Sequence, residues 1–162
     1  MKKQEGINKI QELLASSKVC MMSTYNTKDN INTRPMVYQQ LEDDGTIWFF
    51  TNEFSPKVEE ISANNEVSLS FINESKSNYV ILKGKATLSK DEQKMEELFN
   101  PIVNAWFPKG LKDPKLALLK IDLTSAEYWD NSSSTMVFLF NVAKALFSDT
   151  VYNEGEHAKI RL

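Results

Sequence analysis

The sequence predicts a mainly β protein, a small antiparallel β-barrel with peripheral helices. Six or seven short stretches rich in β-branched and aromatic residues recur along the 162 residues, and most are separated by brief turn-forming segments. The alternation of strand and helix that marks a parallel sheet is missing, and closure into a barrel would remove the exposed edges of the sheet. Because no linker or break in composition divides the chain, we expect one domain over residues 1–162.

The first half of the chain is expected to contain a helix followed by a meander of strands. Apolar residues at helical spacing predict an amphipathic helix over residues 5–16. Strands are predicted over 19–24, 33–40 and 47–51, joined through turn-forming residues that include Asp43-Asp44-Gly45.

The second half adds strands and short helices. Gly84 lies in the middle of a predicted strand, where a bulge or a close backbone approach is expected. Ser89 and Glu92 form a capping-box pattern for a helix that runs to about residue 104 and turns Met95, Leu98, Phe99 and Ile102 inward, and Pro101 should kink or end that helix. The predicted elements are helices over 56–63, 89–104 and 136–147, strands over 66–72, 79–88 and 116–129, and an edge strand within 154–160.

Composition excludes several classes of function. The net charge of −3 gives no general attraction for nucleic acid or anionic lipid, so we expect neither as a partner. Cys20 is the one cysteine, which rules out an intrachain disulfide and a Cys-x-x-Cys redox or zinc motif. No apolar run is long enough to span a membrane and no signal-peptide pattern opens the chain, so the prediction is a cytoplasmic protein without metal.

The segment from Thr46 to Lys57 is the strongest candidate for a binding site. A buried strand leads into Ser55 and Pro56, which suit the N-cap and the first position of a helix, and we expect the Ser55 hydroxyl to cap it. The positive end of the helix and the charge of Lys57 together favour an anion. The alternative is a well-capped helix with a solvated lysine.

Other residues sharpen or limit this hypothesis. Thr51 and Asn52 are placed to hydrogen-bond a polyol or phosphate. Arg34 precedes Pro35 in an extended stretch, and the alternative for it is a surface arginine. Cys20 is interpreted as a packing residue and His157 as a surface or dimer-contact residue. Trp106 either caps a ligand pocket or covers a loop.

Five motifs in order resemble the pyridoxamine 5′-phosphate oxidase-like family of FMN-binding split barrels, and within it the general stress protein 26 group. The resemblance covers nearly the whole chain. The motifs are Thr33-Arg34-Pro35-Met36-Val37, the segment from Trp48 to Asn52 with Ser55 and Lys57, Val67-Ser68-Leu69-Ser70-Phe71, the segment from Tyr79 to Ala86, and Ala126-Glu127-Tyr128-Trp129.

The resemblance implies a six-stranded antiparallel split β-barrel, a homodimer, and FMN, or alternatively FAD, bound between the subunits. It places Arg34, Pro35, Met36 and Val37 along the isoalloxazine and ribityl parts, Thr51 at the ribityl or phosphate end, and Ser55 and Lys57 at the phosphate. Phe50, next to Thr51, is also expected among the flavin-binding residues. Tyr79 falls where the oxidases commonly have a flavin-contacting glutamine. Trp129 matches a tryptophan near the flavin of the partner subunit.

Two departures from the oxidases predict a different activity. Pro56 stands where they carry an arginine, and Asp130-Asn131-Ser132 follows Trp129 where they carry a cationic cluster for the substrate phosphate. We therefore expect an oxidoreductase-like, FMN-binding general stress protein that does not oxidise pyridoxamine phosphate. The alternatives are a non-catalytic flavin-binding, sensing or storage protein, and a barrel without a cofactor.

Overall fold

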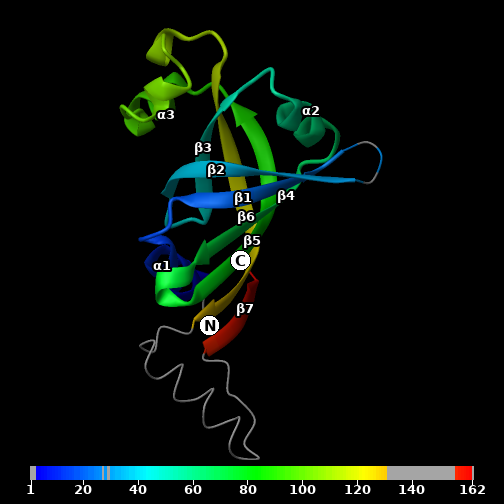
Figure 1. Ribbon diagram of the computed structural model, residues 1–162, viewed down its shortest axis with the longest axis vertical. Helices are drawn as coiled ribbons and strands as arrows, with labels where there is room; N and C mark the ends of the chain where they lie inside the picture. Colours follow the sequence, from blue (N-terminus) through cyan, green and yellow to red (C-terminus); the bar gives the residue numbers. More distant parts are fainter. Residues whose placement is uncertain (1–2, 27, 29, 131–155, 162) are drawn as a thin grey trace, which may run out of the picture.

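The computed structural model describes residues 3–26, 28, 30–130 and 156–161. Within these residues the chain forms three α-helices, seven β-strands and three short 3-10 turns (Figure 1). The helices are α1 (Lys3–Leu14), α2 (Pro56–Ala63) and α3 (Glu92–Leu98), and the 3-10 turns are η1 (Glu74–Lys76), η2 (Val103–Ala105) and η3 (Gly110–Lys112). The strands are β1 (Val19–Tyr25), β2 (Ile31–Leu41), β3 (Thr46–Asn52), β4 (Glu66–Asn73), β5 (Asn78–Ser89), β6 (Leu116–Asp130) and β7 (Glu156–Arg161). The helix predicted over 136–147 lies outside the described residues.

The strands form the predicted antiparallel barrel. Their order is β3-β2-β1-β4-β5-β6-β7, and β3 also pairs with β6, which closes six strands into a ring. β6 pairs with β5 along one edge and is long enough for two partners along the other, where Leu116–Asp122 pair with β3 and Ser125–Asp130 pair with β7. The prediction of a mainly β, six-stranded antiparallel split barrel is therefore confirmed, and the predicted tail strand is β7.

The barrel interior is the main hydrophobic core. It combines inward-facing residues of the strands with Ile10, Leu13 and Leu14 of α1, so the amphipathic face of α1 is buried as predicted. The Tyr38 hydroxyl donates to the Leu14 carbonyl at 3.1 Å, which ties α1 to β2. In Figure 1, α1 lies near one end of the barrel and α2 and α3 lie near the other.

β3 is buried on both faces, which explains its nearly continuous apolar sequence. Ile47 and Phe49 belong to the barrel core. Trp48 belongs to a second cluster on the other face, where it packs with Met95 of α3 and Phe107 of the following loop. The second cluster fixes the segment from α3 to β6 beside β3.

The strand predictions match the structure closely, and Gly84 behaves as expected. The register of β5 against β6 shifts between Lys83 and Gly84, and a Cβ atom at Gly84 would lie 2.6 Å from the Asp122 carbonyl oxygen. Gly84 is therefore required by a close backbone approach.

The helix predicted over 89–104 was too long. α3 covers only Glu92–Leu98, and its N-cap is Asp91, whose carboxylate accepts from the Lys94 amide at 3.0 Å, instead of Ser89. The chain beyond Asn100 turns into η2 because Pro101 cannot continue the helix and the Asn100 side chain accepts from the Ile102 amide. Ile102, expected to face inward, is 64% exposed.

Candidate functional site

A pocket opens where β2 and β3 separate. The two strands pair only between Tyr38–Leu41 and Ile47–Phe49, with a register shift between Tyr38 and Gln40. Beyond these residues the strands diverge, and a pocket of about 400 Å³ lies between them, a size usual for small-molecule sites. Its lining consists of Arg34, Pro35, Met36, Val37, Gln39, Phe50, Thr51, Asn52, Lys57, Ile102, Val103, Trp106 and Phe107.

The edge of β2 that faces this pocket carries backbone groups that none of the described strands pairs, although the Val37 carbonyl accepts from the Gln39 side chain at 3.2 Å. On its other side, β2 pairs with β1, and the Tyr38 amide donates to the Lys18 carbonyl at 3.1 Å. Antiparallel bonding alternates along a strand, so the backbone groups of Pro35 and Val37 point to the pocket side. Pro35 has no N–H group to donate, and its nitrogen lies on the pocket side of β2, where none of the described strands pairs with it.

Two cations form one end of the pocket. Arg34 reaches it from β2 and Lys57 from the first turn of α2, so the barrel and the helix bring together residues that are far apart in sequence. Burial lowers the pKa of Lys57 below its usual value, and the neighbouring charge of Arg34 lowers it further, while Glu60 acts in the opposite direction. An anion bound here would relieve the repulsion between the two cations.

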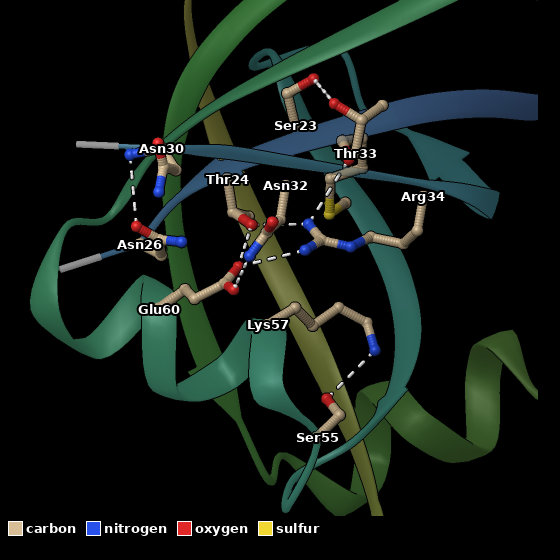
Figure 2. A network of polar contacts seen from close by, with 11 residues as sticks. Ser23, Thr24, Asn26, Asn30, Asn32, Thr33, Arg34, Ser55, Lys57 and Glu60 are labelled. Carbon is tan, nitrogen blue, oxygen red and sulfur yellow. Dashed lines mark hydrogen bonds and ion pairs between the residues drawn. The ribbon is translucent and has the colours of Figure 1, made fainter. Parts of the chain in front are cut away.

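Glu60 of α2 joins Arg34 in a polar network (Figure 2). The guanidinium donates to a Glu60 carboxylate oxygen at 3.1 Å and to the Thr24 hydroxyl at 2.6 Å. Glu60 also accepts from the Thr24 hydroxyl and from the side-chain amide of Asn32. Burial raises the pKa of Glu60, but these hydrogen bonds and the charge of Arg34 outweigh it, so the pKa lies below its usual value. Glu60 is therefore an anion at neutral pH.

The other walls of the pocket are apolar and aromatic. Phe50 of β3 faces the pocket and packs edge-on against Phe99 at a centroid distance of 6.1 Å. Ile102 and Trp106, both lining the pocket, are 64% and 66% exposed. These large apolar surfaces beside a cationic end suit a ligand that is planar or aromatic at one end and anionic at the other.

The predicted site residues divide into two groups. Arg34, Pro35, Met36, Val37, Phe50, Thr51 and Lys57 line the pocket together. Ser55 is not part of the lining, but its hydroxyl accepts from Lys57 Nζ at 3.0 Å. Ser55 does occupy the N-cap position, but its side chain makes no capping hydrogen bond, so the predicted capping role was wrong.

Tyr79 and Trp129 lie elsewhere on this chain. They face each other across β5 and β6, and Ile72 of β4 and His157 of β7 extend the same cross-strand row. The Trp129 and His157 rings stack at a centroid distance of 4.9 Å, and His157 bonds to Glu127 at 3.0 Å. Neither Tyr79 nor Trp129 lines the pocket of its own chain.

Several pocket residues were absent from the sequence-based site. Gln39, Val103 and Phe107 carried no ligand signal, and Ile102 was assigned to a helix interior. Glu60, which pairs with Arg34 but does not line the pocket, had a usable signal, because it follows Lys57 by three residues on α2 and therefore shares its helix face. Asn52 lines the pocket, but its side-chain oxygen accepts from the Phe54 amide at 2.9 Å and so shapes the turn into α2.

Two other residue assignments can be compared with the structure. Cys20 is buried in the barrel core, and burial raises its pKa to about 12, which confirms a packing role. Trp106 lines the pocket, so of its two interpretations the structure favours the pocket. No helix in the described part of the chain has the length and apolar character needed to cross a membrane.

Comparisons with known proteins agree with this fold. A protein named bli-3 from Neurospora crassa is 23% identical over 154 residues, which cover 89% of this chain and 74% of that protein. The crystal structure of a general stress protein 26 from a Jannaschia species superposes with a TM-score of 0.79 at 24% identity, covering 98% of this chain and 99% of that chain. The general stress FMN/FAD binding protein from Xanthomonas citri gives a TM-score of 0.70 at 30% identity, covering 80% of this chain and 92% of that chain.

The family assignment comes from the sequence as a whole. The model of the family described as pyridoxamine 5′-phosphate oxidase like matches residues 5–153, which include the six barrel strands, the pocket and α2. The chain therefore belongs to the pyridoxamine 5′-phosphate oxidase-like family.

Proposed function

We propose that this chain is a flavin-binding protein of the general stress type, with FMN as its ligand. The observation that carries the proposal is the pocket at the split between β2 and β3, which has two cations at one end and aromatic and aliphatic walls elsewhere. A flavin mononucleotide has the matching form, a planar ring system joined through a polyol to a phosphate. The Xanthomonas citri relative named an FMN/FAD binding protein supports the same ligand class.

The chain's own residues would bind and orient the flavin. Lys57 and Arg34 would meet the phosphate, Thr51 the ribityl or phosphate oxygens, and the β2 segment from Pro35 to Val37 would lie along the chain and ring of the flavin. Ser55 would hold Lys57 in place through their 3.0 Å hydrogen bond. Bound FMN would supply hydride or electron transfer, whereas the protein supplies binding, orientation and electrostatics.

The proposal includes a homodimer in which Tyr79 and Trp129 reach the flavin of the partner subunit. Its support is the outer face of the sheet, where Val19, Met21, Ile72 and Tyr79 are between 40% and 56% exposed. A face of this kind is typical of an association surface, and a two-fold interface would bring the same residues from both copies together. One flavin-binding domain over residues 1–162 and a cytoplasmic location stay predictions.

One observation favours the non-catalytic alternative, in which the protein binds or stores flavin without turnover. Asp130, directly after Trp129, has its carboxylate in an ion pair with Lys9 at 2.7 Å. This position thus holds a buried, paired acid where the resemblance places a cationic cluster for the substrate phosphate. Steady oxidation of reduced nicotinamide by the FMN-loaded protein would contradict the alternative, and binding without turnover would support it.

FMN titration tests the proposal directly. Wild-type protein should quench FMN fluorescence with a dissociation constant in the micromolar range or below, and Lys57→Ala should weaken FMN binding about tenfold or more because it removes a charge-assisted contact. Lys85→Ala is the matched control, since it removes the same charge from an exposed position on β5 outside the pocket. No FMN binding at micromolar concentration, or equal effects of the two variants, would refute the proposed site.

A further inference from the structure

The net charge at the cationic end of the pocket is smaller than the sum of its two cations, Arg34 and Lys57. Arg34 is ion-paired with Glu60, and both side chains are mostly buried, with 24% and 12% of their surfaces exposed. Lys57 lies beside them, and within the described residues no carboxylate comes within 4.0 Å of its Nζ atom. One of the two cations is therefore compensated inside the protein, and the anion-binding end carries about one net positive charge.

Glu60 is not needed to hold Arg34 in place. The guanidinium also donates to the Thr24 hydroxyl at 2.6 Å and to the Met22 carbonyl at 3.4 Å, and Thr24 is fully buried on β1. Figure 2 shows the Arg34 guanidinium directed toward Thr24 and Glu60, and Lys57 directed toward Ser55. If Glu60 lost its charge but kept its shape, Arg34 would stay where it is and its charge would act on the pocket.

The charge of the ligand phosphate determines how strongly an uncompensated Arg34 would raise the affinity of the pocket. A terminal phosphate monoester, as in FMN, carries about 1.5 to 2 negative charges at neutral pH. A phosphate within a pyrophosphate linkage, as in FAD, carries a single charge because a second ester-type bond replaces its other ionisable oxygen. A pocket with two uncompensated cations would favour the monoester more strongly than a pocket with one.

We propose that Glu60 is a specificity-determining residue that lowers the preference of this pocket for a doubly charged terminal phosphate, so that the pocket accepts FAD beside FMN. The geometry that carries the proposal is the Arg34–Glu60 ion pair at the same pocket end as Lys57, which donates to Ser55 and has no carboxylate within 4.0 Å in the described part of the chain. The inference rests on the proposed flavin-binding function and names its ligand selectivity.

Three ligands and two variants test the role of Glu60. Wild type, Glu60→Gln and Glu59→Gln are each titrated with FMN, FAD and riboflavin, which has no phosphate. Glu60→Gln should raise the affinity for FMN relative to that for FAD by about fivefold, which corresponds to roughly 1 kcal/mol, because the charge of Arg34 is then no longer compensated. The affinity for riboflavin should stay unchanged. Glu59 is exposed on the same helix and outside the pocket, so Glu59→Gln makes the same change in net charge and should keep the wild-type FMN-to-FAD ratio.

The outcomes separate this inference from the proposed function. An unchanged FMN-to-FAD ratio in Glu60→Gln, or weaker FMN binding, would overturn the role of Glu60 while flavin binding stands. If wild type binds none of the three flavins, the proposed function fails, and calorimetry with phenyl phosphate and methyl phenyl phosphate, a dianion and a monoanion, still decides whether Glu60 sets charge selectivity. Should Glu60→Gln fail to fold, Glu60→Ser removes the same charge with a smaller polar side chain, with the same expected shift.

Discussion

Trp106 is expected to form one wall of the flavin site, and its removal should weaken FMN binding far more than it weakens the fold. The residue sits after η2, where it lines the pocket yet stays 66% exposed. A tryptophan offers roughly 250 Å² of surface, so about 165 Å² is accessible before a ligand binds. This free surface is the part of Trp106 that a planar ligand can cover.

The expected loss follows from that area. A flavin that covers half of the accessible ring removes about 80 Å² from water, which contributes about 2 kcal/mol at about 25 cal/mol per Å². Trp106→Ala should therefore raise the dissociation constant for FMN about 30-fold. Trp106→Phe keeps an aromatic face, so its dissociation constant for FMN should lie between those of wild type and Trp106→Ala.

Fluorescence titration with FMN measures the effect, and urea denaturation checks that each variant is folded. Leu111→Ala is the matched control, because Leu111 is a 41% exposed apolar residue of the same loop that does not line the pocket. Wild-type FMN affinity in folded Trp106→Ala would show that the indole merely covers the loop, and the proposed wall would be wrong.

Two further predictions concern pH and packing. FMN affinity should fall as the pH rises through the lowered pKa of Lys57, at a pH below the 10.5 of an ordinary lysine, because the neutral amine no longer attracts phosphate. The unfolded chain binds more protons between this lowered pKa and the usual one, so the stability of the ligand-free protein should instead rise with pH. A Lys57→Arg variant that loses FMN over the same pH range would contradict this cause, because arginine keeps its charge there. Gly84→Ala should lower the free energy of unfolding, measured by urea denaturation, by about 2 kcal/mol or more. The reason is that a Cβ atom at this position would lie 2.6 Å from the Asp122 carbonyl oxygen. An unchanged denaturation midpoint would refute the required close approach, and Lys85→Ala serves as the neighbouring control.

Local sequence signals predicted the individual strands well. The segment from Glu66 to Ile72 alternates apolar and polar residues, and β4 shows the same alternation of buried and exposed positions. Pro56 marked the start of α2, because a proline at the first helical position loses no hydrogen bond. These signals are strong because each depends on neighbouring residues alone.

The remaining features depend on contacts between distant segments. Closure of the barrel by β3 and β6 joins residues about 70 positions apart, such as Phe50 and Leu118, and no local pattern specifies that register. The Ser55 hydroxyl was expected to cap α2, but Lys57 donates to it instead. Ile102 reads as an inward helix residue by spacing, and only the turn after Pro101 brings it to the pocket.

The position of the pocket follows from how β2 is built. A proline within a barrel strand is tolerated where its nitrogen faces no partner. β2 pairs with β3 only from Tyr38 onward, with a register shift between Tyr38 and Gln40, so Pro35 lies in the part of β2 that has no partner on the β3 side. The separation leaves the gap lined by residues 34–37 of β2 and by Phe50 and Thr51 of β3, and Lys57 of α2 lines it as well. A ligand in the gap would therefore use the hydrogen-bonding edge that barrel closure leaves unpaired, which links the split in the sheet to the binding of a long, one-sided molecule such as a flavin nucleotide.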